Sequence, residues 1–109
     1  MEKEKRKSDE DTIFIGQKPV IVYVNSIATK LIRQNMKEIK ITAMGKHIST
    51  AVDAVEIAMK NYLTGNNTVE KKSIITGTHS FEDGGACSFI EIVLKKIEND
   101  NPKREKQAM

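Results

Sequence analysis

Two short segments of the sequence place a glycine and a lysine immediately before a helical pattern. The first is residues 15–19, which read IGQKP, and the second is residues 43–47, which read AMGKH. A glycine lets the backbone turn sharply or approach a ligand closely. The first turn of a helix offers unpaired N–H groups and a partial positive charge, so a lysine beside it creates an anion site. Two such sites in one small domain predict a polyanionic ligand, with nucleic acid as the foremost candidate.

The spacing of apolar residues predicts the strands and helices that must position these two segments. Strand-like patterns occupy residues 12–15, 38–43, 69–79 and 87–97. Helical spacing occupies residues 20–32 and 48–63. The sequence EDGG at residues 82–85 predicts a hairpin turn between the last two strands.

The predicted order is β-α-β-α-β-β, an α/β chain whose two helices pack on a mixed four-stranded sheet as a two-layer α+β sandwich. Strand–helix–strand crossovers are right-handed and link parallel strands, so both helices begin at the edge where the parallel strands end. The hairpin turn belongs to the same edge. We therefore expect Lys18, Lys46 and the hairpin tip to converge there, where ligands of α/β sheets usually bind.

Length, composition and charge fit one domain with two charged tails. The chain has 109 residues, of which 39% are hydrophobic and 30% are charged, and this is enough to form one core without disulfides. Residues 1–11 are predicted to be a disordered charged tail and residues 98–109 a polar C-terminal tail, which leaves a folded domain at residues 12–97. That domain holds eleven Lys and Arg residues against seven Asp and Glu residues. The folded part is therefore the basic part, as suits a nucleic-acid partner.

Other classes of function lack their sequence signals. The single cysteine, Cys87, and the two scattered histidines form no cluster of metal ligands, and Cys87 is predicted to be a half-buried core residue. No P-loop, nucleophile elbow or Ser/His/Asp arrangement is present. No apolar run reaches the ~18 residues that span a bilayer, and the N-terminus is too charged for a signal peptide. We therefore predict an intracellular protein with no metal site, no membrane span and no recognisable catalytic motif.

These motifs together resemble the Alba family of small archaeal nucleic-acid-binding proteins and their eukaryotic relatives. The resemblance rests on residues 13–20 (IFIGQKPV), 44–53 (MGKHISTAVD) and 90–92 (IEI), and it extends from about residue 12 to residue 97. It implies a homodimer, or a heterodimer with another Alba-like chain, that binds double-stranded DNA and RNA with little sequence preference and without a cofactor. It also implies a role in chromatin packaging or in RNA and translational regulation, in the cytoplasm or on the chromosome, or in the nucleus of a eukaryote.

The sequence departs from the family pattern at three places. Gln17 stands where the family commonly has a lysine subject to acetylation, and its neutral amide resembles the acetylated, weaker-binding form. In the second segment Met44 takes the place of one arginine and Lys46 the place of another. The family hairpin is usually longer and carries arginines, whereas this one holds Glu82 and Asp83, which a phosphate repels. The fold is still implied, but tight wrapping of DNA is not.

Nine residues are predicted to contact nucleic acid. Lys18 and Lys46 are assigned contacts to phosphate, of the kind that positions a strand without reading its sequence. The other seven candidates are Gly16, Gln17, Asn25, Arg33, Lys40, Gly45 and His47. Each charged or polar candidate has an ordinary alternative as a solvated surface side chain.

The three phenylalanines do not form a sequence motif of the kind that stacks RNA bases. RNA-recognition sheets place aromatic residues together on one exposed face, and no such motif is legible here. Phe14 and Phe89 are therefore predicted to pack in the core. Phe81, beside the hairpin turn, is predicted to contact a sugar, a base or a dimer mate instead.

Two other functions compete with backbone binding by a dimer. One is an RNA-binding subunit of a ribonucleoprotein such as RNase P or RNase MRP, paired with a different Alba-like chain. The other is a lysine-dependent nuclease or lyase on abasic DNA, in which the Lys18 amine attacks the sugar as a Schiff-base nucleophile.

Overall fold

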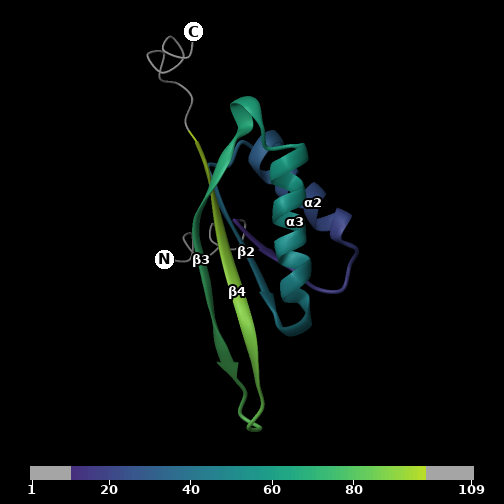
Figure 1. Cartoon of the computed structure of the whole chain (residues 1–109), viewed down its shortest axis with the longest axis vertical. Helices are drawn as coiled ribbons and strands as arrows, with labels where there is room; N and C mark the ends of the chain where they lie inside the picture. The colour runs from purple at the N-terminus through teal and green to yellow at the C-terminus, as the bar shows by residue number, and fades with distance from the viewer. Residues whose placement is uncertain (1–10, 98–109) are drawn as a thin grey trace.

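Two helices cover one face of a four-stranded sheet (Figure 1). The computed structural model describes residues 11–97. The strands are β1 (Thr12–Phe14), β2 (Glu38–Met44), β3 (Val69–Ser80) and β4 (Ala86–Lys96). The helices are α2 (Val20–Ala28), which continues as a π-helical turn over Thr29–Arg33, and α3 (Ile48–Asn61). The predicted β-α-β-α-β-β order and the mixed sheet with two helices are confirmed.

The two predicted tails lie almost wholly outside the described residues. Residues 1–10 and 98–109 are not described. Asp11, which the sequence places in the N-terminal tail, is described, and its backbone carbonyl accepts the Lys40 N–H at 2.8 Å. The sheet pairing therefore begins one residue before the predicted domain boundary.

The strand order in the sheet is β1-β2-β4-β3. β1 pairs with β2 in parallel, as the crossover rule predicts, and β4 lies antiparallel between β2 and β3. Side chains alternate between the two faces of each strand. The face that packs against the helices is apolar and buried. The buried residues that the sheet contributes are Ile13, Ile15, Ile39, Ile41, Ala43, Val69, Ile90, Ile92 and Leu94.

The other face of the sheet, here called the open face, has no helix over it. Phe14 lies on this face and is 68% exposed, so the prediction that Phe14 packs in the core is wrong. The reason is register, because Ile13 pairs with the buried Ile41 and Phe14 with Thr42 on the opposite face. The same prediction for Phe89 is also wrong, because Phe89 pairs with Met44 on the open face and is only half-buried there. Its ring lies across Gly77, where an added Cβ would come within 2.8 Å of it.

β3 and β4 continue beyond the end of β2. The last pair between β2 and β4 is Met44 with Phe89, whereas β3 and β4 remain paired as far as Ser80 and Ala86. Residues 78–88 form a projecting hairpin arm, which points down in Figure 1. Its turn closes where predicted, with the Gly84 N–H donating to the Phe81 carbonyl at 3.0 Å. Cys87 is half-buried, but it lies on this arm and not in the core.

Candidate nucleic-acid interface

Two adjacent parallel strands deliver the two glycine–lysine segments to one edge of the sheet. Phe14 of β1 is in register with Thr42 of β2, and the Ile15 N–H donates to the Thr42 carbonyl at 2.9 Å. Lys18 and Lys46 each follow this registered pair by the same number of residues. Both helices begin at the lower end of the molecule in Figure 1, the end from which the hairpin arm projects. We call residues 16–18 and 45–47 together the lysine edge.

The hydroxyl of Tyr23 holds the first loop of the lysine edge. Tyr23 is buried in the first turns of α2, and its Oη accepts the N–H of Gly16 at 2.8 Å and the N–H of Lys18 at 3.2 Å. These two amides are therefore not available to an anion. The side chains of Gln17 and Lys18 remain exposed. Anion binding by this loop therefore depends on side chains and on the first amides of α2.

The second loop has a different backbone, although its sequence is similar. Gly45 has a φ of 57°, a left-handed conformation that costs other residues about 1–2 kcal/mol. It opens a single 3₁₀ turn, η2 (Gly45–His47), which leads directly into α3. The predicted sharp glycine turn therefore occurs here, whereas Gly16 is not left-handed and an added Cβ would lie 3.5 Å from the Tyr23 hydroxyl. The likeness of the two segments lies in their position and charge.

The two lysines of this edge carry uncompensated charge. Within residues 11–97, neither Lys18 nor Lys46 forms an ion pair. No acidic residue lies in the first turn of α2 or α3, and neither helix has a side-chain N-cap. By contrast, Lys71 pairs with Glu56, and Lys72 pairs with Glu38 at 3.3 Å. The lysine edge therefore has a positive potential that an anion would reduce.

The remaining predicted contacts lie at varying distances from this edge. Gly16, Gln17, Gly45 and His47 belong to it, and Asn25 is exposed on α2. Arg33 ends the π-helical turn after α2, and thirteen residues of helix beyond Val20 place it about 20 Å from the lysine edge. The structure therefore does not bring Arg33 to this edge.

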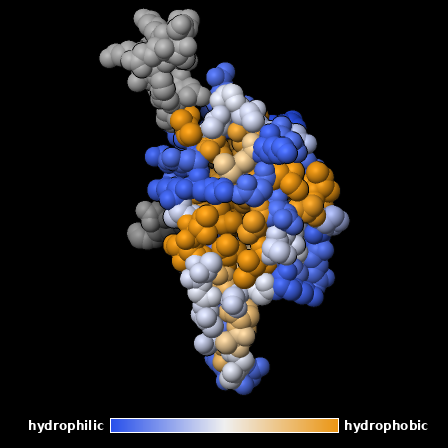
Figure 2. All heavy atoms as spheres, in the orientation of Figure 1, coloured by the Kyte–Doolittle hydropathy of each residue, from blue (hydrophilic) through white to orange (hydrophobic). Residues whose placement is uncertain are grey.

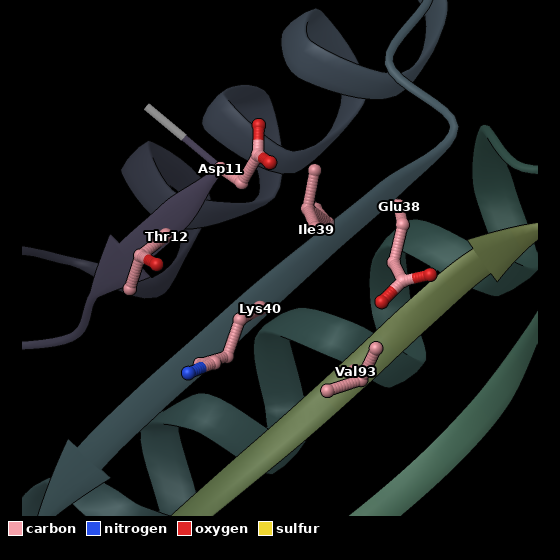
Figure 3. A pocket seen from close by; sticks show the side chains of 6 residues that line it. All are labelled: Asp11, Thr12, Glu38, Ile39, Lys40 and Val93. Atoms are coloured by element: carbon pink, nitrogen blue, oxygen red, sulfur yellow. The ribbon is translucent and has the colours of Figure 1, made fainter. Parts of the chain in front are cut away.

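Lys40 lies on the open face, farther back along β2. It lines a shallow pocket of about 350 Å³ with Asp11, Thr12, Glu38, Ile39 and Val93. Figure 3 shows its side chain between Thr12 of β1 and Val93 of β4, with the helices behind the sheet. Lys40 forms no ion pair within the described residues, so its ammonium group is available to a ligand on the open face.

Phe14 and Met44 are exposed apolar residues at the lysine edge that the sequence interpretation did not treat as ligand contacts. With Ile15, Thr42, Ala43 and His47 they line a pocket of about 300 Å³ at the ends of β1 and β2. A signal was present in the sequence, because a strand that alternates Ile-Phe-Ile must send Phe14 to the face opposite its neighbours. The sequence did not show which face of the sheet the helices cover, so it did not show whether Phe14 is buried or exposed.

Within residues 11–97, no three acidic, histidine or cysteine side chains gather in a way that could hold a metal ion. None of the helices in this range combines the length and the apolar character needed to span a bilayer.

Comparison with known proteins identifies the family. The Alba family model matches residues 11–76. The chain belongs to the Alba family. It is 42% identical over 88 residues to the DNA/RNA-binding protein Alba of Methanoculleus marisnigri, covering 78% of this chain and 92% of the relative. It is 39% identical over 90 residues to the DNA/RNA-binding protein Alba 1 of Archaeoglobus fulgidus, covering 80% of this chain and 97% of that protein.

Solved structures of Alba proteins share the fold. Alba from Thermoplasma volcanium superposes with a TM-score of 0.70 at 34% identity, covering 78% of this chain and 99% of that one. ALBA1 from Trypanosoma brucei superposes with a TM-score of 0.63 at 26% identity, covering 91% of this chain and 80% of that one. The Alba resemblance drawn from the sequence is thereby confirmed. The names of the archaeal relatives describe binding proteins and not enzymes, in agreement with the predicted absence of catalysis.

Replacement of Tyr23 by phenylalanine tests the role of the hydroxyl in the first loop. The Tyr23→Phe variant leaves the amides of Gly16 and Lys18 without their acceptor, and we expect it to lower the free energy of unfolding by about 1–3 kcal/mol. Hydrogen exchange at these two amides should accelerate. The matched control is Tyr62→Phe, because the exposed Tyr62 hydroxyl makes no hydrogen bond within the described residues. Equal urea denaturation curves for the two variants would contradict the assignment.

Proposed function

We propose that this member of the Alba family binds DNA and RNA through the phosphate backbone, with little sequence preference, at the lysine edge. The observation that carries the proposal is the delivery of two unpaired lysines to one sheet edge by adjacent parallel strands. A single lysine is a point charge that attracts phosphate without recognising a base. The names of the archaeal relatives, which describe DNA/RNA-binding proteins, support the same ligand class.

The composition of the hairpin arm is consistent with binding to duplex DNA without recognition of individual bases. Residues 78–88, which form the arm, contain no lysine or arginine, and they include Glu82 and Asp83. The commonest specific contact to a base edge is an arginine or lysine on guanine, and the tip of this arm carries two carboxylates and no cation. The arm therefore adds repulsion rather than attraction near a phosphate, and affinity depends on the lysine edge.

We further propose that the protein forms a dimer through the side of β3 that lies next to α3. Ile74 pairs with the buried Ile92 and so faces the helix layer, yet it is 54% exposed. Val52 of α3 is 40% exposed. Figure 2 shows an apolar patch over α3 and β3. A second copy seated on this patch would bury it and combine two lysine edges in one particle.

The cellular roles that fit this chemistry are chromatin packaging and the regulation of RNA or translation. Both require binding to many sequences, and both fit a location in the cytoplasm or on the chromosome. The lyase alternative has no support in the site, since Lys18 is exposed and a Schiff-base nucleophile needs a desolvated or otherwise activated amine.

Loss of either lysine should weaken binding to every sequence. We expect the Lys18→Ala and Lys46→Ala variants each to lower affinity for duplex DNA and for structured RNA, and to reduce the slope of log K against log salt by about 0.9 on duplex DNA. Fluorescence anisotropy across a salt series measures both quantities. Lys60→Ala, at the other end of α3, is the matched control and should leave the slope unchanged. An unchanged slope in both edge variants would remove these lysines from the interface.

Restoring a lysine at position 17 should tighten binding. Gln17→Lys adds a charge beside Lys18 on the exposed first loop, and one more phosphate contact steepens the salt dependence by about 0.9 on duplex DNA. Gln34→Lys makes the same chemical change at the far end of α2, where Gln34 is also exposed. The same anisotropy titration compares the two variants. If both tighten binding equally, net charge and not the lysine edge explains the effect.

The dimer proposal is tested by two neighbouring isoleucines on opposite faces of β3. We expect Ile74→Glu to produce a monomer, because a buried unpaired charge opposes association. Ile75→Glu is the control, since Ile75 pairs with Glu91 on the open face and is 50% exposed. Sedimentation velocity of the full chain measures both. A dimer that survives Ile74→Glu, or dissociates equally in both variants, would show that the copies meet elsewhere.

A further inference from the structure

The pocket at the ends of β1 and β2 combines an exposed aromatic ring with an apolar wall. It has a volume of about 300 Å³ and is lined by Phe14, Ile15, Thr42, Ala43, Met44 and His47. Phe14 is the most exposed of the large hydrophobic side chains on the described part of the chain. Leaving such a ring in water forgoes the free energy of burying it. A ligand with a flat apolar surface would recover that free energy.

The same backbone segments supply this pocket and the lysine edge. Phe14 precedes Gly16 by two residues, Met44 directly precedes Gly45, and His47 directly follows Lys46. An aromatic pocket therefore lies beside the two segments that carry unpaired lysines. A nucleic-acid strand presents the complementary surface, because it alternates anionic phosphates with flat bases. In a duplex the base faces are hidden by stacking, whereas in a single strand they are accessible.

We propose that this pocket receives one unpaired base of a single-stranded segment whose phosphates lie on Lys18 and Lys46. The base stacks on the ring of Phe14 and contacts Met44. The proposal rests on the phosphate binding proposed above, and it adds a ligand class, single-stranded DNA or RNA, that the lysines alone do not select. Stacking accepts every base, so the pocket keeps the low sequence preference.

The open face offers a path for the strand beyond the pocket. Thr12 and Phe14 are paired with Lys40 and Thr42, so Lys40 lies two residues back along β2, about 7 Å from Thr42. Its ammonium group lies in the shallow pocket of Figure 3, without an ion-pair partner in residues 11–97. A strand that leaves the Phe14 pocket along β2 would meet the Lys40 ammonium group. It would also pass Glu91, which pairs with Thr42, and the carboxylates of Asp11 and Glu38, which line the same pocket as Lys40.

A tryptophan at position 14 reports on stacking directly, because the chain contains no tryptophan. The exposed site accommodates the larger ring, so we expect the Phe14→Trp variant to show strong fluorescence quenching when it binds single-stranded oligothymidylate. A blunt duplex of mixed sequence should leave its fluorescence unchanged at saturation. Tyr62→Trp, an exposed aromatic position at the end of α3, should respond to neither ligand. Absence of quenching while anisotropy shows the single strand bound, or equal quenching by the duplex, would overturn the proposal.

Removal of the ring separates this proposal from phosphate binding. Phe14→Ala should lower affinity for oligothymidylate by roughly 5- to 150-fold and leave duplex affinity unchanged. Phe14→Leu keeps an apolar side chain on the open face and should show nearly the same selective loss, which guards against a folding defect. Lys18→Ala should lower affinity for both oligothymidylate and the duplex. Suppose that Lys18→Ala lowers affinity for both the single strand and the duplex, while Phe14→Ala lowers neither affinity or lowers both equally. Phosphate binding at the lysine edge would then be supported, and the proposal of a base pocket would be wrong. If Phe14→Ala converts a dimer to a monomer, the pocket is a contact between copies and the proposal is wrong.

Discussion

The parallel pairing of β1 with β2 is the constraint on which the functional surface depends. β1 is only three residues long, yet its register with β2 decides where both glycine–lysine segments leave the sheet. The pairing is stabilised from the helix side, where Ile13, Ile15 and Ile41 are buried in the core. Burial of such side chains is worth about 1.5–3 kcal/mol each. A shift by one residue would send Ile13 to water and Phe14 into the core, and would move Lys18 away from Lys46.

Tyr23 connects this sheet edge to the helix layer. Its ring is part of the core, and its hydroxyl accepts two amides of the loop that carries Lys18. The loop is therefore shaped by protein contacts before any ligand arrives, which reduces the entropy lost on binding. The second loop reaches the same edge through a left-handed Gly45 and one 3₁₀ turn. Two unlike backbones thus present the same charge at the same edge.

The faces of the domain have distinct chemistry. The side of β3 next to α3 is apolar and suits a second copy, the lysine edge is cationic, and the open face carries Phe14 and Lys40 beside each other along the strands. The hairpin arm contributes carboxylates at its tip and no cation. Two lysines near the start of β3 already have acidic partners, because Lys71 pairs with Glu56 and Lys72 pairs with Glu38.

The order of the elements, the hairpin turn, the family and the glycine–lysine segments could be predicted from the amino-acid sequence, because they follow from local periodicity, turn residues and motifs. The convergence of these segments on one sheet edge also followed, since the handedness of crossovers leaves little freedom. The distance of Arg33 from Lys18 follows from the predicted helix over residues 20–32, which places Arg33 at its far end. The folded structure was needed to show that Phe14 faces water. It also decided which lysines are paired and which amides Tyr23 occupies. These properties depend on which sheet face the helices cover and on contacts between residues distant in the chain, and a local pattern contains neither.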